Sequence, residues 1–353
     1  MNLGTDLVLM TGAAGWLGRA VLHALVHGLP ESPLVGAAQP GLRIRVLVLP
    51  GEEQAVREIG GDVEIVTGDL RNPRDGTRLC HGAGGAALLH LAGIIHPGKV
   101  RDFYDVNLRG TLNVMSAAVE SGVRRAVVMS SNSPLGCNPH PDHVFDEDSP
   151  YNPYLNYGRS KMQMEQRVAE FQAGGRIETV VIRAPWFYGP FQPPRQTLFF
   201  TMIREGKAPI VGGGANLRSM AYTDNLAQGI LLAALTPQAA ERTYWIADRR
   251  PYAMNEVVDT VERLLETEFG RPCAHKRLRL PGIASEVALL VDRGLQAAGL
   301  YQQKIHVLSE MNKTIACSIA RAERELGYAP AVALEEGMRR SLRWMDERGM
   351  LPA

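Results

Sequence analysis

Short apolar runs alternate with amphipathic segments along the first half of the chain. The first run, residues 7–10, ends at a glycine-rich turn, and residues 16–27 then carry apolar side chains at helical spacing. Helical patterns also cover residues 106–121 and 157–173. Five more apolar runs have the length of buried strands, at residues 43–49, 63–67, 86–91, 126–130 and 179–183. This alternation predicts an α/β fold, a doubly wound parallel sheet covered by helices on both faces, with ligands at the carboxyl ends of its strands.

The regular alternation weakens after Gly189. Residues 190–209 are irregular and contain several prolines, and helical patterns return at 254–268 and 285–299. We therefore expect two interleaved domains. Residues 1–189 would form the sheet domain. Residues 190–353 would form a smaller, mainly helical substrate-binding lobe, from which part of the chain returns to the sheet.

The composition argues against several kinds of partner. Lysine and arginine total 38 against 37 acidic residues, so the net charge of +1 offers no field for nucleic acid, and we expect a small-molecule substrate. The four cysteines are widely spaced and the histidines lack metal-ligand spacing, which predicts free thiols, a cytoplasmic location and no metal site. The N-terminus lacks the pattern of a signal peptide. Glu286, Asp292 and Arg293 interrupt the apolar segment 283–300, so we expect no membrane span.

A glycine motif joins the first strand to the first helix. The sequence TGAAGWLG at residues 11–18 has GxxGxxG spacing, which lets bare backbone approach a pyrophosphate at a helix N-terminus. It predicts a Rossmann-type dinucleotide site. The residues expected to line it here are Gly12, Ala14, Gly15, Trp16, Leu17 and Gly18.

Two acidic positions bear on the identity of the dinucleotide. Asp69 and Leu70 follow the third strand, where an aspartate can accept a hydrogen bond from an adenine amino group. The second strand ends without the usual ribose-binding acid or phosphate-binding arginine, but Glu52 and Glu53 follow it closely. These glutamates would repel a 2′-phosphate, so we expect NAD as the cofactor and leave NADP open.

Tyr157 and Lys161 lie four residues apart at the start of a predicted helix, on the same face. A nearby ammonium favours the phenolate form of tyrosine, which makes proton exchange at the phenol feasible. The pair therefore predicts acid–base chemistry that accompanies hydride transfer.

Together with the glycine motif, this pair resembles the extended short-chain dehydrogenase/reductase family. That family includes sugar-nucleotide epimerases, dehydratases and 3β-hydroxysteroid dehydrogenases. The resemblance covers about residues 7–345, and the matching segments follow one another in the order and at the spacing of the family. The matching segments are TGAAGWLG (11–18), GDL (68–70), LLHLAG (88–93), NLRGTLNV (107–114), MSSNSPLG (129–136), YGRSK (157–161), RAPWFYGP (183–190) and YTDNLAQG (222–229).

The resemblance implies a role for each matched residue. Ser131 would hydrogen-bond the reacting oxygen, with Ser130 and Ser133 left open. Tyr157 would be the general acid or base, and Lys161 would bind the nicotinamide ribose and lower the tyrosine pKa. Asn107 would complete the catalytic group from the adjoining helix. Further cofactor contacts would come from Leu91, Ala92, Gly93 and Pro185.

The resemblance leaves the reaction open between classes. Asn132 stands where dehydratases of the family have an acid, so dehydration is the least favoured reaction. Arg218 matches the arginine that binds substrate diphosphate in sugar-nucleotide epimerases, although an intradomain contact would explain it equally well. With Ser131 and Ser133 it is the expected substrate site. We therefore expect an epimerase or dehydrogenase acting on a nucleotide-linked sugar. The alternatives are redox at an apolar ring alcohol, which the apolar segment 283–300 favours, and a dinucleotide-sensing regulator without catalysis.

The resemblance also predicts a homodimer. Helices 106–121 and 157–173 would pair across it as a four-helix bundle, with Met162, Val168 and the alanines near Ala117 supplying apolar surface.

Overall fold

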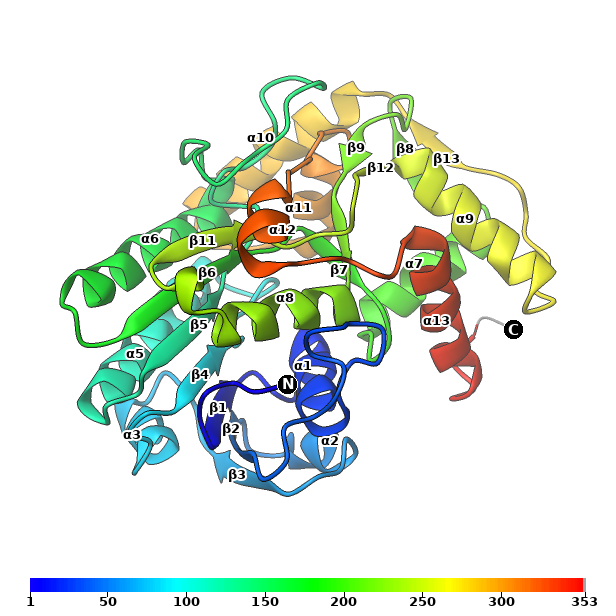
Figure 1. The fold of residues 1–353 in the computed structure, drawn as a ribbon. Coiled ribbons are helices and arrows are strands. Elements are labelled where there is room, and N and C mark those ends of the chain that lie inside the picture. The colour runs from blue at the N-terminus through cyan, green and yellow to red at the C-terminus, as the bar shows by residue number, and fades with distance from the viewer. Residues whose placement is uncertain (352–353) are drawn as a thin grey trace.

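A computed structural model describes residues 1–351 and has a seven-stranded parallel sheet at its centre (Figure 1). The strands, in spatial order, are β11 (Arg242–Trp245), β6 (Glu178–Arg183), β5 (Arg125–Met129), β4 (Ala87–His90), β1 (Leu7–Thr11), β2 (Arg43–Val48) and β3 (Val63–Thr67). Every neighbouring pair is parallel. The chain order reverses between β1 and β4, which is the point where such sheets bind ligands. The predicted doubly wound, Rossmann-type fold is confirmed.

Helices cover both faces of this sheet because alternate side chains of each strand point to opposite sides. Val8 and Met10 of β1 pack into one apolar layer, whereas Leu7 and Leu9 pack into the other. The first layer is formed with α1 (Trp16–His27), α2 (Glu53–Arg57), α8 (Thr223–Leu235) and α12 (Ala320–Leu326). The second is formed with α3 (Pro73–Cys80), α5 (Thr111–Glu120) and α6 (Leu155–Ala173).

The predicted helix at 106–121 begins differently in the structure. A short helix α4 (Val100–Phe103) continues into the π-helix η1 (Tyr104–Gly110), and α5 starts only at Thr111. A π-helical turn inserts an extra residue and often marks a functional site.

A second apolar core lies beyond the carboxyl ends of the strands. Its elements are short strands and longer helices. They are β7 (Trp186–Tyr188), α7 (Pro194–Arg204), β8 (Pro209–Val211), β10 (Met220–Tyr222), β12 (Tyr252–Ala253), α9 (Met254–Thr267) and α13 (Leu334–Asp346). The short strands β9 (Leu217–Arg218) and β13 (Leu278–Leu280) pair with β12 and β8, and helices α10 (Ile283–Ala297) and α11 (Gln303–Glu310) pack against each other outside this core. The 3-10 turn η2 (Pro237–Ala239) links α8 to β11, so this part of the chain lies on the main sheet rather than in the second core.

The apolar side chains expected at a dimer contact are placed differently. Val168 and Ala117 are buried inside the monomer, in the layer under α5 and α6. They cannot meet a partner, because they already pack against the sheet. Met162 alone of the three is partly exposed.

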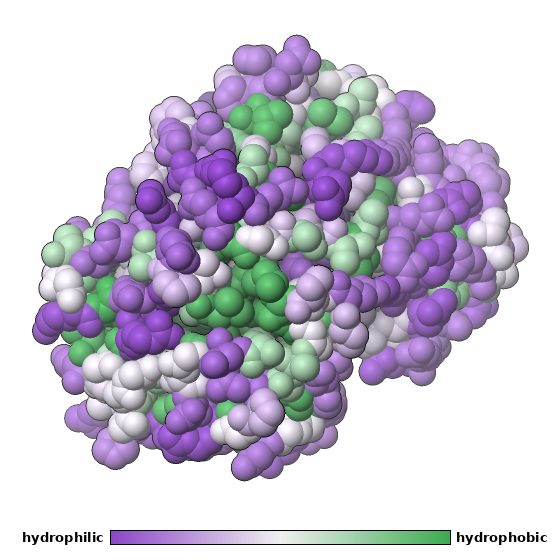
Figure 2. Space-filling model, in the orientation of Figure 1, coloured by the Kyte–Doolittle hydropathy of each residue, from purple (hydrophilic) through white to green (hydrophobic). Residues whose placement is uncertain are grey.

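Polar side chains cover most of the face seen in Figure 2, with an apolar group near α8. No helix within residues 1–351 is long and apolar enough to cross a membrane. The same residues contain no cluster of three potential metal ligands.

Candidate active site

The glycine motif forms a tight turn that leaves no room for side chains. Gly12 has φ of +74°, and a Cβ there would lie 2.7 Å from the Ala92 nitrogen. A Cβ on Gly18 would lie 1.9 Å from the Gly12 carbonyl oxygen. Helix α1 follows with no side-chain cap and no acidic residue in its first turn. Its first N–H groups are therefore available to an anion, which fits the pyrophosphate expected here.

A buried histidine, which sequence reasoning had only excluded as a metal ligand, supports this turn. The two ring nitrogens of His90 are hydrogen-bonded to Thr11 Oγ1 at 2.8 Å and Thr111 Oγ1 at 2.9 Å. Thr11 Oγ1 also accepts from the Ala92 N–H. Burial lowers the pKa of His90 to about 3, so the ring is neutral and acts as a rigid bridge.

Asn107 holds the segment after β4 in place. Its Oδ1 accepts from Ile94 N–H at 2.8 Å, and its Nδ2 donates to the Ile94 carbonyl at 3.0 Å and to Ser160 Oγ at 3.3 Å. A Cβ on Gly93 would lie 3.2 Å from Asn107 Oδ1 and 3.4 Å from Lys161 Nζ. The π-helical turn thus brings Asn107, Gly93 and Lys161 together, and Asn107 positions backbone in this structure.

At the adenine end of the expected site, two carboxylates already accept hydrogen bonds from the protein itself. Asp69 accepts from the Arg71 guanidinium, and this hydrogen bond lowers the Asp69 pKa. Leu70 packs against Gly110, where a Cβ would lie 1.6 Å from its Cδ1. Glu53 accepts from Thr67 Oγ1 at 3.1 Å and Gly51 N–H at 2.9 Å, so its carboxylate lies at the ends of β2 and β3.

Tyr157 and Lys161 both lie on the buried side of α6. Tyr157 is 8% exposed, and the Lys161 ammonium donates to the Met129 carbonyl at 2.9 Å. Burial lowers the pKa of Lys161 to about 8 and raises the pKa of Tyr157 to about 12, against the lowering effect of a hydrogen bond from Ser131. Burial is the largest influence on the Tyr157 pKa, and the Lys161 ammonium is bound to a carbonyl, so the role of Lys161 in lowering the tyrosine pKa stays a prediction.

The structure separates the three candidate serines. The Ser131 hydroxyl lowers the pKa of the Tyr157 phenol, and its Oγ accepts from Ser133 N–H at 3.3 Å, with Ser133 Oγ 3.4 Å away. Ser130 instead donates to Glu165, whose carboxylate pairs with Arg183 at 2.8 Å inside the protein. Ser131 is therefore the serine beside Tyr157, while Ser130 belongs to a structural network.

An aromatic wall faces Tyr157, and sequence reasoning missed it. The Phe103 ring lies 5.7 Å from the Tyr157 ring and 5.2 Å from the Tyr301 ring. The Tyr301 hydroxyl is hydrogen-bonded to His96 Nδ1 at 2.8 Å. No motif marks these residues, since Tyr301 is contributed by a segment 144 positions along the chain from Tyr157. Only the fold brings them together.

Two predicted contact residues join the sheet to the second core. The Trp16 indole N–H donates to the carbonyls of Pro190 at 2.8 Å and Gly189 at 3.2 Å, and its ring packs 4.9 Å from Phe187. Pro185 is buried just after β6. Leu17 is buried as well, whereas Ala14 and Leu91 are partly exposed.

Arg218 is buried in β9. Its guanidinium donates to the Glu310 carbonyl, and it has no carboxylate partner within residues 1–351. Its positive charge therefore has no counterion there, and the guanidinium is held in place by a backbone carbonyl.

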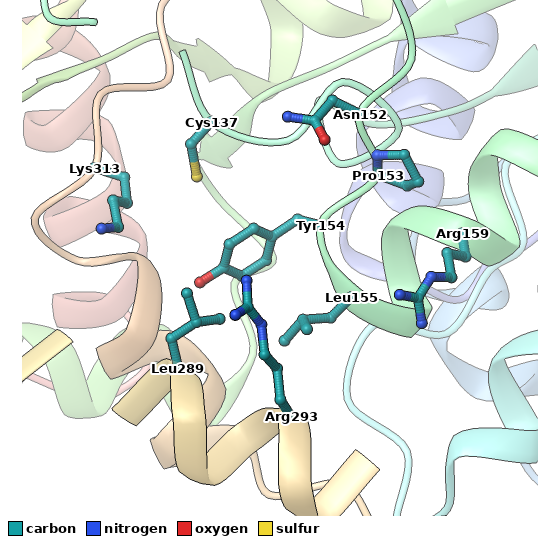
Figure 3. Close-up of a pocket in the computed structure, with 9 residues that line it drawn as sticks. All are labelled: Cys137, Asn152, Pro153, Tyr154, Leu155, Arg159, Leu289, Arg293 and Lys313. Atoms are coloured by element: carbon teal, nitrogen blue, oxygen red, sulfur yellow. The ribbon is translucent and has the colours of Figure 1, made fainter. Parts of the chain in front are cut away.

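A cavity of about 380 Å³ opens beside the start of α6 (Figure 3). Arg159 of α6, Arg293 of α10 and Lys313 after α11 all line it. The Tyr154 ring lies in its middle, with its hydroxyl hydrogen-bonded to Ser309. The lining contains no acidic residue, so the cavity is basic; it also includes Cys137, Asn152, Pro153, Leu155 and Leu289.

Comparison with known proteins places this site in context. Residues 8–247 match the model of the NAD dependent epimerase/dehydratase family. An uncharacterized protein, y4nL, from Sinorhizobium fredii is 54% identical over 99% of this chain and 98% of its own length. The Arabidopsis thaliana 3beta-hydroxysteroid-dehydrogenase/decarboxylase isoform 1 is 28% identical over 94% of this chain and 78% of its own length. A Stigmatella aurantiaca enzyme, 4-hydroxy-2-methyl-3-oxo-4-farnesyl-3,4-dihydroquinoline-1-oxide ketoreductase, is 27% identical over 93% of each chain.

Solved structures share the fold at lower identity. DesIV, a dTDP-glucose 4,6-dehydratase from Streptomyces venezuelae with NAD bound, has a TM-score of 0.74 at 24% identity, over 98% of both chains. A UDP-glucuronic acid 4-epimerase from Bacillus cereus in complex with NAD has a TM-score of 0.74 at 19% identity, over 97% of this chain and 99% of its own.

Proposed function

The chain belongs to the NAD dependent epimerase/dehydratase family, and from that premise we propose that it transfers hydride between a nicotinamide dinucleotide and a secondary alcohol or ketone. The observation that carries this proposal is the grouping of Ser131, Tyr157 and Lys161 next to the glycine turn. The bound dinucleotide would supply or accept the hydride. The protein would supply the proton and hold the reacting oxygen.

Each residue has a role that its surroundings support. In reduction of a ketone, Tyr157 would donate its phenolic proton to the carbonyl oxygen as hydride reaches the carbon. Its raised pKa keeps that proton in place at neutral pH. Ser131 would hold the oxygen, and the Lys161 ammonium would stabilise the phenolate that remains. In oxidation the same proton and hydride move in the opposite direction.

The dinucleotide that fits best is NAD. The bare backbone at Gly12 and Gly18 and the uncapped start of α1 suit a pyrophosphate. Backbone hydrogen bonds lower the Glu53 pKa, so an ionised carboxylate lies where NADP would place its 2′-phosphate. The solved structures of DesIV and of the UDP-glucuronic acid 4-epimerase both contain NAD, which agrees with this choice.

The substrate class that the site favours is an apolar ring alcohol or ketone. Phe103 and Tyr301 give the side facing Tyr157 an aromatic character. The steroid dehydrogenase and the quinoline ketoreductase, which align over more than 90% of this chain, are named for substrates of this kind.

A nucleotide-linked sugar is the second candidate, and Arg218 is the observation that favours it. A buried guanidinium without a carboxylate partner suits a diphosphate. Calorimetry with a nucleoside diphosphate tests this. If the wild type binds it and Arg218→Ala weakens binding at least about tenfold, while dinucleotide affinity is unchanged, this candidate takes first place.

Tyr157→Phe tests the chemistry itself. With hydroxysteroids and ketosteroids as probes, and UDP-sugars in parallel, turnover followed by NADH absorbance should fall about a hundredfold or more. NAD affinity should stay within about twofold, because the glycine turn remains. Tyr244→Phe is the control. Tyr244 lies in β11 and its hydroxyl donates to Glu325 of α12, so this variant should keep full turnover. Near-normal turnover by Tyr157→Phe would refute the assignment.

A further inference from the structure

Helix α10 exposes apolar side chains and buries polar ones, which is the reverse of an ordinary surface helix. Its outward side chains are large and apolar: Ile283 is 68% exposed, Val287 54%, Leu290 67% and Val291 46%. These positions repeat at helical spacing and form one stripe. The helix lies at the outer edge of the molecule (Figure 1), so no other element within residues 1–351 covers this face.

The inward face of the same helix is polar, and its polar side chains form hydrogen bonds within the protein. Asp292 is hydrogen-bonded to His306 Nδ1 at 2.7 Å and accepts from Gln296 at 3.0 Å. Gln296 in turn accepts from the Asn156 N–H, and Ser285 donates to the Leu308 carbonyl. Turning the helix to hide its apolar stripe would break all of these bonds, so the outward orientation is fixed.

The segment that contains the stripe has an excess of positive charge. Residues 271–304 contain six basic residues (Arg271, Lys276, Arg277, Arg279, Arg293, Lys304) but only two acidic ones (Glu286, Asp292), although the whole chain has a net charge of +1. Arg279, Arg293 and Lys304 are exposed and form no ion pair within residues 1–351. Arg293 and Leu289 of the same helix also line the basic cavity, together with Arg159 and Lys313 (Figure 3).

We propose that the outward face of α10 docks on an anionic lipid bilayer. An apolar stripe bordered by cations is the arrangement with which a helix lies in a membrane surface. The apolar side chains would enter the headgroup region, and Arg279, Arg293 and Lys304 would meet lipid phosphates. A second copy of the chain fits less well, because a twofold contact on this stripe would bring the same three cations toward their counterparts.

Docking here would place the active site at the bilayer. Leu289 and Arg293 of α10 line the basic cavity together with Tyr154 and Leu155, which lie three and two residues before Tyr157 on the chain. An apolar substrate could then enter from the lipid. The surface proposal does not depend on the reaction, and it is tested without turnover.

Vesicle co-sedimentation tests it with the full chain. We expect wild-type protein to pellet with vesicles of phosphatidylcholine and phosphatidylglycerol, and at least tenfold less with phosphatidylcholine alone. Val287→Glu combined with Leu290→Glu should reduce the bound fraction at least tenfold. Arg279→Gln or Lys304→Gln should each weaken binding by about fivefold. Leu34→Glu, a substitution at a side chain 52% exposed and distant from α10, is the matched control and should bind as wild type does.

Thermal unfolding would confirm that each variant is folded. Failure of wild-type protein to pellet with anionic vesicles would overturn the proposal, as would full binding by the Val287→Glu and Leu290→Glu variant. Sedimentation velocity without vesicles gives the remaining outcome. A wild-type dimer that this variant converts to monomer would assign the face to a second copy and would also overturn it.

Discussion

Lys161 keeps a positive charge in a buried site, and this should lower the free energy of unfolding at neutral pH. Its pKa is lowered by burial to about 8, whereas an unfolded chain leaves lysine near about 10.4. Below pH 8 both states hold the proton, so the folded state bears the full desolvation cost. Between these two values the folded state loses its proton first, and that cost disappears as pH rises.

Lys161→Met should therefore stabilise the protein at pH 7 while abolishing turnover. The gain should approach about 3 kcal/mol and shrink toward zero by about pH 10.5. Urea unfolding at pH 7 and at pH 10 measures both values. A gain that is absent, or that grows with pH, would contradict the buried charge.

The choice among Ser130, Ser131 and Ser133 shows where sequence reasoning stops at this scale. The resemblance indicated this segment, but successive side chains at a strand end point to opposite sides. Ser130 faces Glu165 and Ser131 faces Tyr157, and nothing in the local sequence indicates which of the two points to the active site. Only the position of α6 settles it.

At the scale of elements, the glycine turn is the strictest constraint. Gly18→Ala places a Cβ within 1.9 Å of the Gly12 carbonyl, so either the turn or the start of α1 must shift. We expect dinucleotide affinity to fall at least about tenfold and stability to fall by about 1–3 kcal/mol. Gly294→Ala in α10, where nothing lies within 4 Å of the added carbon, should instead stabilise by about 0.5–1 kcal/mol. Dinucleotide titration and denaturant unfolding compare the two, and equal affinities would refute the close approach.

Helix α6 is anchored to β6 by a buried ion pair. Glu165 contacts Arg183 and also accepts from Ser130 and Tyr151. Glu165→Gln would leave the guanidinium without its counterion and should destabilise the protein by about 3–5 kcal/mol. Glu170→Gln, in an exposed pair with Arg167 on the same helix, should change stability by less than about 1 kcal/mol. Denaturant midpoints separate the two, and similar losses would show that the buried pair has no special role.

The elements that could be predicted are those with a clear period. β1 to β6 and the helices α1 and α6 follow from apolar runs and helical spacing. Helix α8 does not, because it is buried on nearly all sides and its apolar residues have no preferred face. Strands such as β9 and β12 have two residues each, which is too short for any period to appear.

At the scale of the whole molecule, the homodimer remains a prediction. If α5 and α6 pair across a twofold axis, they do so with outward residues such as Arg159, Gln166 and Arg167, because Val168 and Ala117 face inward. Such a contact should weaken in salt. Sedimentation velocity at micromolar protein, at low and high ionic strength, checks this, and a monomer under both conditions would contradict it.

Trp16 gives the molecule a built-in optical reporter. Its indole belongs to the helix that begins at the glycine turn, yet it is held by the Gly189 and Pro190 carbonyls on the side of the second core. Any opening between the two cores changes the polarity around this ring, and reduced nicotinamide nearby can quench it by energy transfer. Among the four tryptophans, Trp245 is fully buried at the end of β11 in the sheet and serves as a constant background. Emission spectra of the protein, compared with those of Trp16→Phe, can therefore follow cofactor arrival and lobe movement in a single measurement, without any added label.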